Sequence, residues 1–253
     1  MKSVKTLTHC VQGTDYNMPL TIGSGITVGG GINILSSAGL VTDGLTLNLD
    51  AGDSASYPGS GSTWTDLAGT ADNITLVNSP TYTSGTPAYF TFNGSNQYGT
   101  GSGANVLPST AYTKSVWFRI NAYADNNIVS SSTGGHFMFM LNSASNKIYC
   151  GHANWGVYSA YPSTATISLN TWYYAALTFN TTDGMVLYLN GSQDSTYTAN
   201  KTAHAGNGST NIATFGGGNL LNGRIAQVHC YNRALTAAEV LQNYDTYKAR
   251  YGL

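Results

Sequence analysis

Acidic residues are the first place to look for chemistry, because hydrolysis of a glycosidic bond needs two carboxylates at a fixed separation. The chain has one glutamate, Glu239, and its aspartates lie mostly in segments typical of turns. Asp50 and Asp53 are close in sequence, but Ala51-Gly52 between them indicates a strand running into a loop. No segment carries alternating acids on a strand, and no G-x-S-x-G serine motif occurs. The sequence therefore predicts a protein that is not an enzyme.

Oxygen ligands for a hard cation are the remaining option for small-ion chemistry. Asp50, Asp53 and Asp72, with Asn73, lie near expected loop ends and could supply oxygens to calcium, which takes six to eight of them. The alternative is that these side chains form local Asx-turns. The five histidines lack metal-ligand spacing. We therefore expect no cofactor, with calcium left open.

Three cysteines, Cys10, Cys150 and Cys230, form no C-x-x-C pair, so zinc and thioredoxin-like chemistry have no support. We expect small, reduced, apolar side chains, although a bridge between Cys150 and Cys230 remains open. His136 and His229 fall on expected strands and are predicted to be core or sheet-face residues rather than catalysts.

Sugar recognition typically combines an aromatic surface with planar amides that reach the ring hydroxyls. The segment 151–162 is rich in turn residues and carries Asn154, Trp155, Tyr158 and Tyr161. These four residues are the predicted glycan-binding site. In the alternative, Trp155 packs over a sheet edge or a subunit contact. The other tryptophans fall in structural patterns and are expected in the core; they are Trp64, Trp117 and Trp172.

Composition excludes several classes of partner. Charged residues make up only 8% of the chain, against roughly 25% in an average soluble domain. The ten Lys and Arg are scattered, so no basic stripe could neutralise a row of phosphates or an anionic membrane. No apolar run is long enough to span a bilayer, and the N-terminus lacks the apolar core of a secretory signal. We expect neither nucleic-acid binding nor membrane insertion.

Apolar residues alternate with polar ones from about Gly44 onward, the pattern of half-buried antiparallel strands. Dipeptides typical of tight turns separate the segments; they are Asn93-Gly94, Asp183-Gly184, Asn190-Gly191, Asn207-Gly208 and Asn222-Gly223. The spacing predicts two packed sheets. Strands are expected at 45–49, 88–92, 116–120, 136–141, 147–150, 164–168, 172–180, 185–190, 212–215 and 223–231.

One helix is predicted near the C-terminus. Thr236 and Glu239 have the spacing of a capping box, in which each side chain satisfies a backbone donor of the other residue. Val240, Leu241, Tyr244 and Tyr247 follow at helical spacing.

Residues 1–42 differ from the rest and are predicted to form a separate arm before a domain at 43–253. The arm repeats a pattern of a β-branched residue, glycine and isoleucine, and its apolar positions are Ile22, Ile26, Val28, Ile32 and Ile34. Two such units cannot close a core alone. The arm is therefore expected to associate with copies of itself or with another protein, unless it is a flexible linker.

Several segments, in order, resemble the laminin-G-like, concanavalin A-like lectin family. Trp64-Thr65-Asp66-Leu67-Ala68-Gly69 resembles its W-x-D-L-S-G turn, and Phe92 to Tyr98 is similar to F-D-G-x-x-D-Y with both acids replaced by amides. Leu187 to Gly191 resembles its l-Y-v-N-G strand end. The most distinctive match is Gly223 to Glu239, which is similar to the family's closing G-x-I-x-x-V-x-x-Y-N-R-A-L-S-x-x-E pattern.

This resemblance implies an all-β, two-sheet antiparallel jelly-roll sandwich, with an N-terminal Gly/Ile-rich β arm and one short C-terminal helix. A jelly roll behind a Gly-Ile arm is similar to bacteriophage virion proteins such as capsid decorations, spikes and fibres. By that analogy the chain is a virion structural protein, a homotrimer anchored through its arm to other virion proteins and exposed on the particle surface. Whether it binds host polysaccharide stays open, and so does a cellular carbohydrate-binding module without a virion role.

Overall fold

A computed structural model of the chain describes residues 39–70, 72–103, 106–131, 138–154, 157–199, 201–204 and 208–253. For residues 138–140, 153–154 and 157–159 it describes the backbone only. The chain divides into two compact units, residues 1–36 and 37–253, and every described residue belongs to the second. Within the described residues, no helix is both long and apolar enough to span a membrane.

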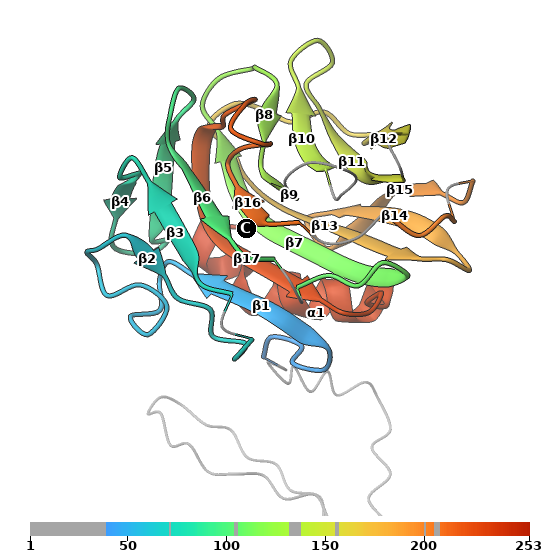
Figure 1. Cartoon of the computed structure of the whole chain (residues 1–253), viewed down its shortest axis with the longest axis horizontal. Helices are drawn as coiled ribbons and strands as arrows, with labels where there is room; N and C mark the ends of the chain where they lie inside the picture. Colours follow the sequence, from blue (N-terminus) through green and yellow to red (C-terminus); the bar gives the residue numbers. More distant parts are fainter. Residues whose placement is uncertain are drawn as a thin grey trace, which may run out of the picture. The chain divides into compact units, whose positions relative to one another are not determined.

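The larger layer is an eight-stranded antiparallel sheet in the order β15-β14-β13-β7-β17-β5-β4, with β1 also paired to β17 (Figure 1). Its strands are β1 (Leu45–Asp50), β4 (Thr81–Thr83), β5 (Tyr89–Asn93), β7 (Ala111–Ile120), β13 (Trp172–Asn180), β14 (Gly184–Leu189), β15 (Ser192–Tyr197) and β17 (Asn222–Tyr231). The first half of β17 pairs with β5 and the second half with β1, while β7 runs along its other edge. β17 is therefore the central strand of this layer.

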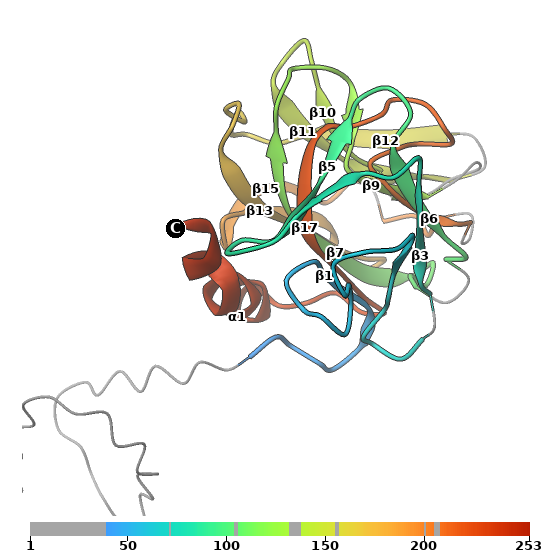
Figure 2. The ribbon, with the colours of Figure 1, turned by 90° about the vertical axis from the view of Figure 1, so that its left-hand side faces the viewer.

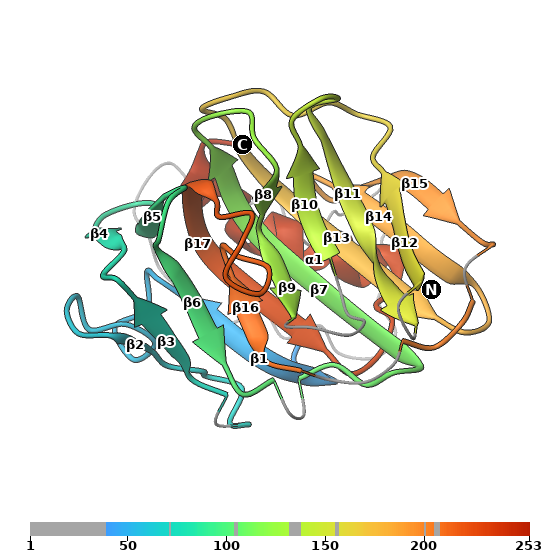
Figure 3. The same cartoon turned by 45° about the horizontal axis from the view of Figure 1, so that its top comes forward.

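Two smaller sheets form the second layer, and they adjoin at β9 and β10 (Figure 3). The four-stranded sheet contains β12 (Val157–Pro162), β11 (Lys147–Asn154), β10 (Met138–Asn142) and β8 (Asn126–Asn127). The five-stranded sheet contains β2 (Thr63–Trp64), β3 (Ile74–Val77), β6 (Tyr98–Gly101), β16 (Thr210–Ile212) and β9 (Val129–Ser131). The main hydrophobic core lies between the layers and includes Leu47, Phe90, Phe118 and Ile225. The predicted jelly-roll class is confirmed.

The outer face of the large sheet, away from the second layer, is partly covered by helix α1 (Ala237–Tyr247), as Figure 2 shows. The capping box predicted for Thr236 and Glu239 is present. A 3₁₀ helix, η1 (Lys248–Tyr251), follows α1 and brings Tyr251 back onto the sheet, where its ring stacks on Trp117 at 3.9 Å between centroids. Trp117 and Tyr251 belong to a second, smaller core between sheet and helix.

Three local predictions are wrong, and two of them have an identifiable reason. The strand expected at 212–215 shares only Ile212 with β16, and Ala213 and Thr214 lie outside any strand. The expected strand at 164–168 does not form, because the backbone N–H groups of Thr164 and Ala165 donate to the Asp194 carboxylate instead of to a neighbouring strand. Asn222-Gly223 is not a turn but the start of β17. A Cβ at Gly223 would lie 2.5 Å from the Arg119 carbonyl oxygen, so glycine is needed here for close approach to β7.

The boundary of the folded unit lies before residue 43. Val41, which falls within the predicted arm, is buried, and its backbone N–H donates to Asn243 Oδ1 of α1 at 2.9 Å. Residues 39–42 therefore pack with the jelly roll.

Candidate functional site

A polar pocket opens on the outer side of the large sheet, where the end of β1 meets η1. Its volume is about 240 Å³, and it is lined by the 85–88 loop together with Asp50, Gly52, Arg250 and Tyr251. Pockets for drug-sized ligands usually measure about 300–1,000 Å³, so this one suits a smaller group such as one sugar ring.

Asp50 lines this pocket, and hydrogen bonds hold its carboxylate in place. Its Oδ2 accepts hydrogen bonds from Gln227 Nε2 at 2.7 Å and from Arg250 Nη1 at 2.6 Å, and its Oδ1 accepts from the Gly52 N–H at 2.8 Å. Gln227 Oε1 in turn accepts from the Tyr251 hydroxyl at 3.0 Å. This network links β1, β17 and η1 and holds the carboxylate in one orientation.

Arg250 is the pocket's solvent-facing charge, because its side chain is 41% exposed whereas that of Asp50 is 9% exposed. Burial alone would lower the pKa of Arg250, but the charge and hydrogen bond of Asp50 raise it above the ordinary value. Its guanidinium also lies over the Tyr247 ring, 4.7 Å from the centroid. The geometry presents a carboxylate and a guanidinium side by side in fixed planes.

Aromatic rings continue from the pocket across the outer face. Trp172 lies 5.1 Å from Tyr251 and 5.6 Å from Tyr89, between ring centroids, and both Trp172 and Tyr89 are half-buried. Rings of this kind can stack against the apolar face of a sugar. A pocket with paired charges beside an aromatic strip suits a polyhydroxylated ligand.

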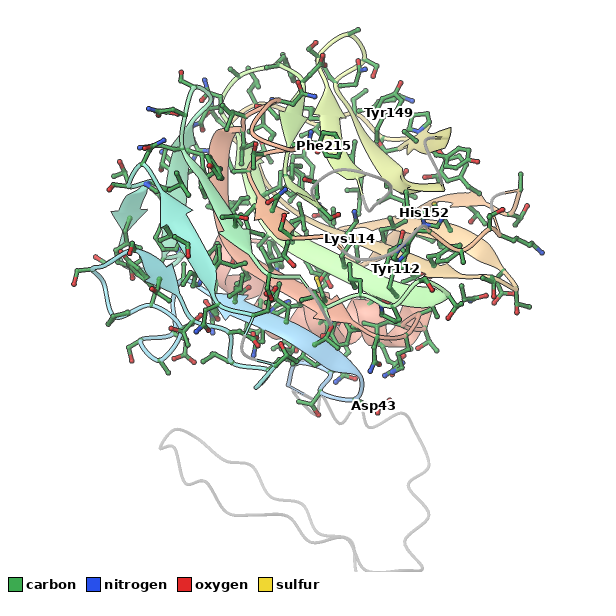
Figure 4. The ribbon with its side chains drawn as sticks, in the orientation of Figure 1. Asp43, Tyr112, Lys114, Tyr149, His152 and Phe215 are labelled. Carbon is green, nitrogen blue, oxygen red and sulfur yellow. The ribbon has the colours of Figure 1, made fainter. Side chains whose placement is uncertain are left out.

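The inner face of the large sheet also carries titratable groups with shifted pKa values, and they lie in the closed core. Figure 4 shows Tyr112 and Lys114 on β7 and His152 on β11, and the Tyr112 hydroxyl is hydrogen-bonded to His152 Nδ1 at 3.0 Å. Burial lowers the pKa of Lys114 to about 7. Burial also raises the pKa of Cys150 to about 12, so its thiol is a poor nucleophile at neutral pH.

The glycan-binding segment predicted at 151–162 is a hairpin of β11 and β12. Trp155 lies outside the described residues, as do the side chains of Asn154 and Tyr158. Tyr161 pairs with Cys150, is half-buried against the main core, and stacks on Tyr197 at 4.3 Å between centroids. The part of Tyr161 available to a ligand is therefore limited, and the predicted four-residue site stays a prediction.

The three calcium candidates each hold local structure. Asp50 is paired with Arg250, and Asp53 Oδ1 accepts from the Ala55 N–H at 2.8 Å. Asp72 Oδ1 accepts from Ser102 Oγ at 2.7 Å and from the Gly103 N–H at 2.8 Å. The described residues contain no group of three or more His, Cys, Asp or Glu placed to hold a metal ion. The Asx-turn alternative fits Asp53, whose acceptor bond is of that local kind.

The remaining predictions divide by position. Trp64 and Trp117 are fully buried as expected, whereas Trp172, the first residue of β13, is only half-buried. His229 is a buried sheet-face residue, and burial lowers its pKa to about 4. Cys150 and Cys230 are buried free thiols. Outside the described residues lie Cys10, His136 and the arm positions Ile22, Ile26, Val28, Ile32 and Ile34.

Sequence reasoning missed Arg250 and Tyr251, which lie in the last residues of the chain beyond any motif. Arg250 and Asp50 are 200 positions apart, and no local pattern links them. The capping box predicted α1, and this helix is the one sequence feature that precedes Arg250 and Tyr251. The sequence did not show that the residues after the helix contact β1 and β17.

Comparison with known proteins gives the same architecture. The model of the concanavalin A-like lectin/glucanase superfamily, in its laminin-G form, matches residues 92–241. The chain therefore belongs to this superfamily. No curated protein sequence matches it significantly.

Solved structures with little sequence identity share the fold. The binding domain of Paraclostridial Mosquitocidal Protein 1 superposes with a TM-score of 0.67 at 18% identity, over 81% of this chain and 53% of that one. Domain 4 of AbnA, a GH43 arabinanase from Geobacillus stearothermophilus solved with arabinotriose, gives 0.65 at 15% identity, over 80% and 98%. Trypanosoma rangeli sialidase gives 0.61 at 15% identity, over 81% and 33%. The chain thus spans about half of the first protein, a third of the sialidase and nearly all of the arabinanase domain.

Proposed function

We propose that this jelly roll is a carbohydrate-binding domain and that the chain displays it on the surface of a bacteriophage particle. The observation that carries carbohydrate binding is the pocket in which Asp50 and Arg250 are held side by side, next to Trp172 and Tyr251. Vicinal hydroxyls can bond to a carboxylate and a guanidinium at once, while a ring face stacks on the aromatic strip. The superfamily membership and the arabinotriose in the similar arabinanase domain support this assignment.

Binding without catalysis fits the pocket because Asp50 is the one carboxylate among its lining residues. The chain's single glutamate, Glu239, is bonded to Arg233 and Thr236. A glycosidase would need a second acid at a set distance. Turnover of polysaccharide that vanishes in Asp50→Asn or Asp53→Asn would contradict this part of the proposal.

The carbohydrate-binding part is tested on a glycan array with the full chain. Trp172→Ala should weaken any binding by about tenfold, because a stacked sugar loses on the order of 1.4 kcal/mol of contact. Tyr123→Ala is the matched control, since Tyr123 is 42% exposed and lies outside the pocket. Absence of binding to every glycan, or binding that Trp172→Ala leaves unchanged, would contradict the site.

The virion part rests on the arm, whose glycine-spaced Ile and Val need a partner to be buried. We propose a homotrimer formed through residues 1–42, with the arm also contacting other virion proteins. Light scattering of the full chain should give three copies, and Ile26→Asp with Ile32→Asp should give one. A wild-type chain that is monomeric and has no affinity for a capsid or tail protein would contradict it.

The second candidate is a cellular carbohydrate-binding module without a virion role. The arabinanase domain favours it, because this chain covers 98% of an isolated domain that was solved with a trisaccharide. Equally tight glycan binding by the wild-type chain and the Ile26→Asp, Ile32→Asp variant, with both chains monomeric, would favour this candidate over the virion protein.

A further inference from the structure

Two arginines lie opposite each other on the outer face of the large sheet. The sheet register places Trp172, Arg119, Arg224 and Thr91 in one row across β13, β7, β17 and β5. Their strand neighbours Phe118 and Ile225 point into the main core, so the row faces outward. The two cations are therefore direct cross-strand neighbours.

Their charges are not compensated within the described part of the chain. The ion pairs there join carboxylates to Arg233, Lys248 and Arg250. Like charges directly opposite each other in a sheet are destabilising. In a chain with only ten Lys and Arg, this pairing needs a reason beyond packing.

Their donors are also largely unused. Arg119 Nη2 donates to Asn170 Oδ1 at 2.9 Å, and the Arg224 guanidinium lies over the Tyr89 ring, 4.5 Å from the centroid. The Nε atoms of both arginines are buried and have no hydrogen-bond partner among the described residues. A buried donor without a partner destabilises the folded state. An acceptor beside the two guanidinium groups would compensate both charges and accept hydrogen bonds from their Nη atoms.

An oxyanion is the group that meets these conditions, because the planar fork of an arginine matches the oxygens of a carboxylate or a sulfate. The rings of Tyr89 and Trp172, next to the pair, offer a stacking surface for the sugar that carries the anion. We propose that Arg119 and Arg224 bind the acidic group of an anionic saccharide, a carboxylate or a sulfate ester. The inference rests on the proposed carbohydrate binding and names its ligand class.

The test uses calorimetry on the full chain with three probes: an oligogalacturonate, its neutral methyl ester, and a sulfated carrageenan oligosaccharide, which carries sulfate esters but no carboxylate. At least one acidic probe should bind about tenfold or more tightly than the neutral ester, because hydrogen bonds to a charged acceptor are roughly twice as strong as those to a neutral one. Which acidic probe binds more tightly identifies the anion.

Arg119→Met and Arg224→Met should each remove about tenfold of the preferred probe's affinity. Arg119→Lys should lose part of it, since lysine keeps the charge but not the fork. The matched control is Lys201→Met, which removes an exposed charge elsewhere and should leave affinity within about twofold. Variants are first checked for wild-type thermal unfolding.

The experiment distinguishes failure of the anion site from failure of the proposed carbohydrate binding. Equal binding of acidic and neutral probes, or acidic binding that survives both Arg→Met changes, overturns the anion site and leaves carbohydrate binding intact. Binding to neutral glycans on an array with no affinity for either acidic probe does the same. Binding to no saccharide of any kind overturns both proposals.

Discussion

The two halves of the outer face differ in whether their charged side chains have a partner of opposite charge. In the half covered by α1 and η1, charged side chains meet opposite charges: Asp50 with Arg250, and Glu239 with Arg233. In the open half, which consists of Tyr89, Arg119, Trp172 and Arg224, both arginines lack a carboxylate partner among the described residues. The covered half is complete as a folded structure, whereas the open half is completed by an anion. This difference is the basis for placing the acidic group of the saccharide on the open half, next to the pocket of Asp50 and Arg250.

The largest expected effect lies in the covered half, at Asn243. Its Oδ1 accepts from the Val41 N–H, and its Nδ2 donates to the Tyr231 hydroxyl at 2.9 Å. Asn243→Ala should lower the free energy of unfolding by about 3 kcal/mol, because two buried groups lose their partner. Urea denaturation measures it, with Gln193→Ala as the control, because Gln193 is exposed and lies on the edge strand β15. A loss below about 1 kcal/mol would show that the covered half does not depend on this pairing.

Lys114, on the inner face of the large sheet, provides a second comparison with the open half. Its folded pKa of about 7 lies below the ordinary 10.5, so burial penalises the charged form fully below pH 7 and progressively less up to about 10.5. Lys114→Met should therefore raise the free energy of unfolding by about 2 kcal/mol at pH 6. The difference from wild type should shrink by pH 9. A difference in the free energy of unfolding between variant and wild type that stays constant or grows with pH would contradict burial of the charge.

Glu239 gives a smaller pH effect, and here the charged form stabilises the folded state, whereas the charged form of Lys114 destabilises it. The Arg233 hydrogen bond, with the capping bonds of Thr236, holds the pKa of Glu239 at about 2, below its ordinary 4.5. Its stabilisation is complete above pH 4.5 and is lost as the pH falls towards 2. Glu239→Gln should cost about 1 kcal/mol at pH 7 and should flatten the acid limb of the stability curve. An acid limb identical to wild type would contradict this account.

The smallest effect on stability is expected in the open half. Arg224→Met should change the free energy of unfolding by less than about 0.5 kcal/mol, because relief of repulsion with Arg119 offsets the lost contact with Tyr89. Chemical denaturation beside Asn243→Ala makes the contrast direct. A loss above about 1 kcal/mol would mean that the arginine pair is structural.

Sequence patterns predicted the strands whose one face is core, such as Trp172–Asn180, because burial on one face imposes period-two alternation. They predicted α1 because its capping box consists of Thr236 and Glu239, which are close together in the sequence. They could not place Arg119 opposite Arg224, since that requires the register of β7 and β17 and the irregularity between Ile225 and Gln227. Short strands such as β2 and β8 were also missed, because two residues carry no period.

The sequence predicts a sugar-binding aromatic surface at 151–162, and the structure offers a second candidate place for such a surface, at Trp172. Trp172 was expected in the core because it begins a regular strand, yet its position at the end of β13 leaves it half-buried beside Arg119. Side chains along a strand point alternately to the core and to the outer face, so the side of an aromatic residue is inferred from its strand neighbours. At the end of a strand there are neighbours on one side only, and the inference is weakest there.

The open half is tested most directly by nuclear magnetic resonance of the full, ¹⁵N-labelled chain titrated with the acidic oligosaccharide. The account predicts that the largest shifts fall on the Arg119 and Arg224 Nε–H signals and the Trp172 indole, with the signals under α1 unchanged. Shifts confined to residues 151–162, or spread without any change at the two arginines, would contradict it.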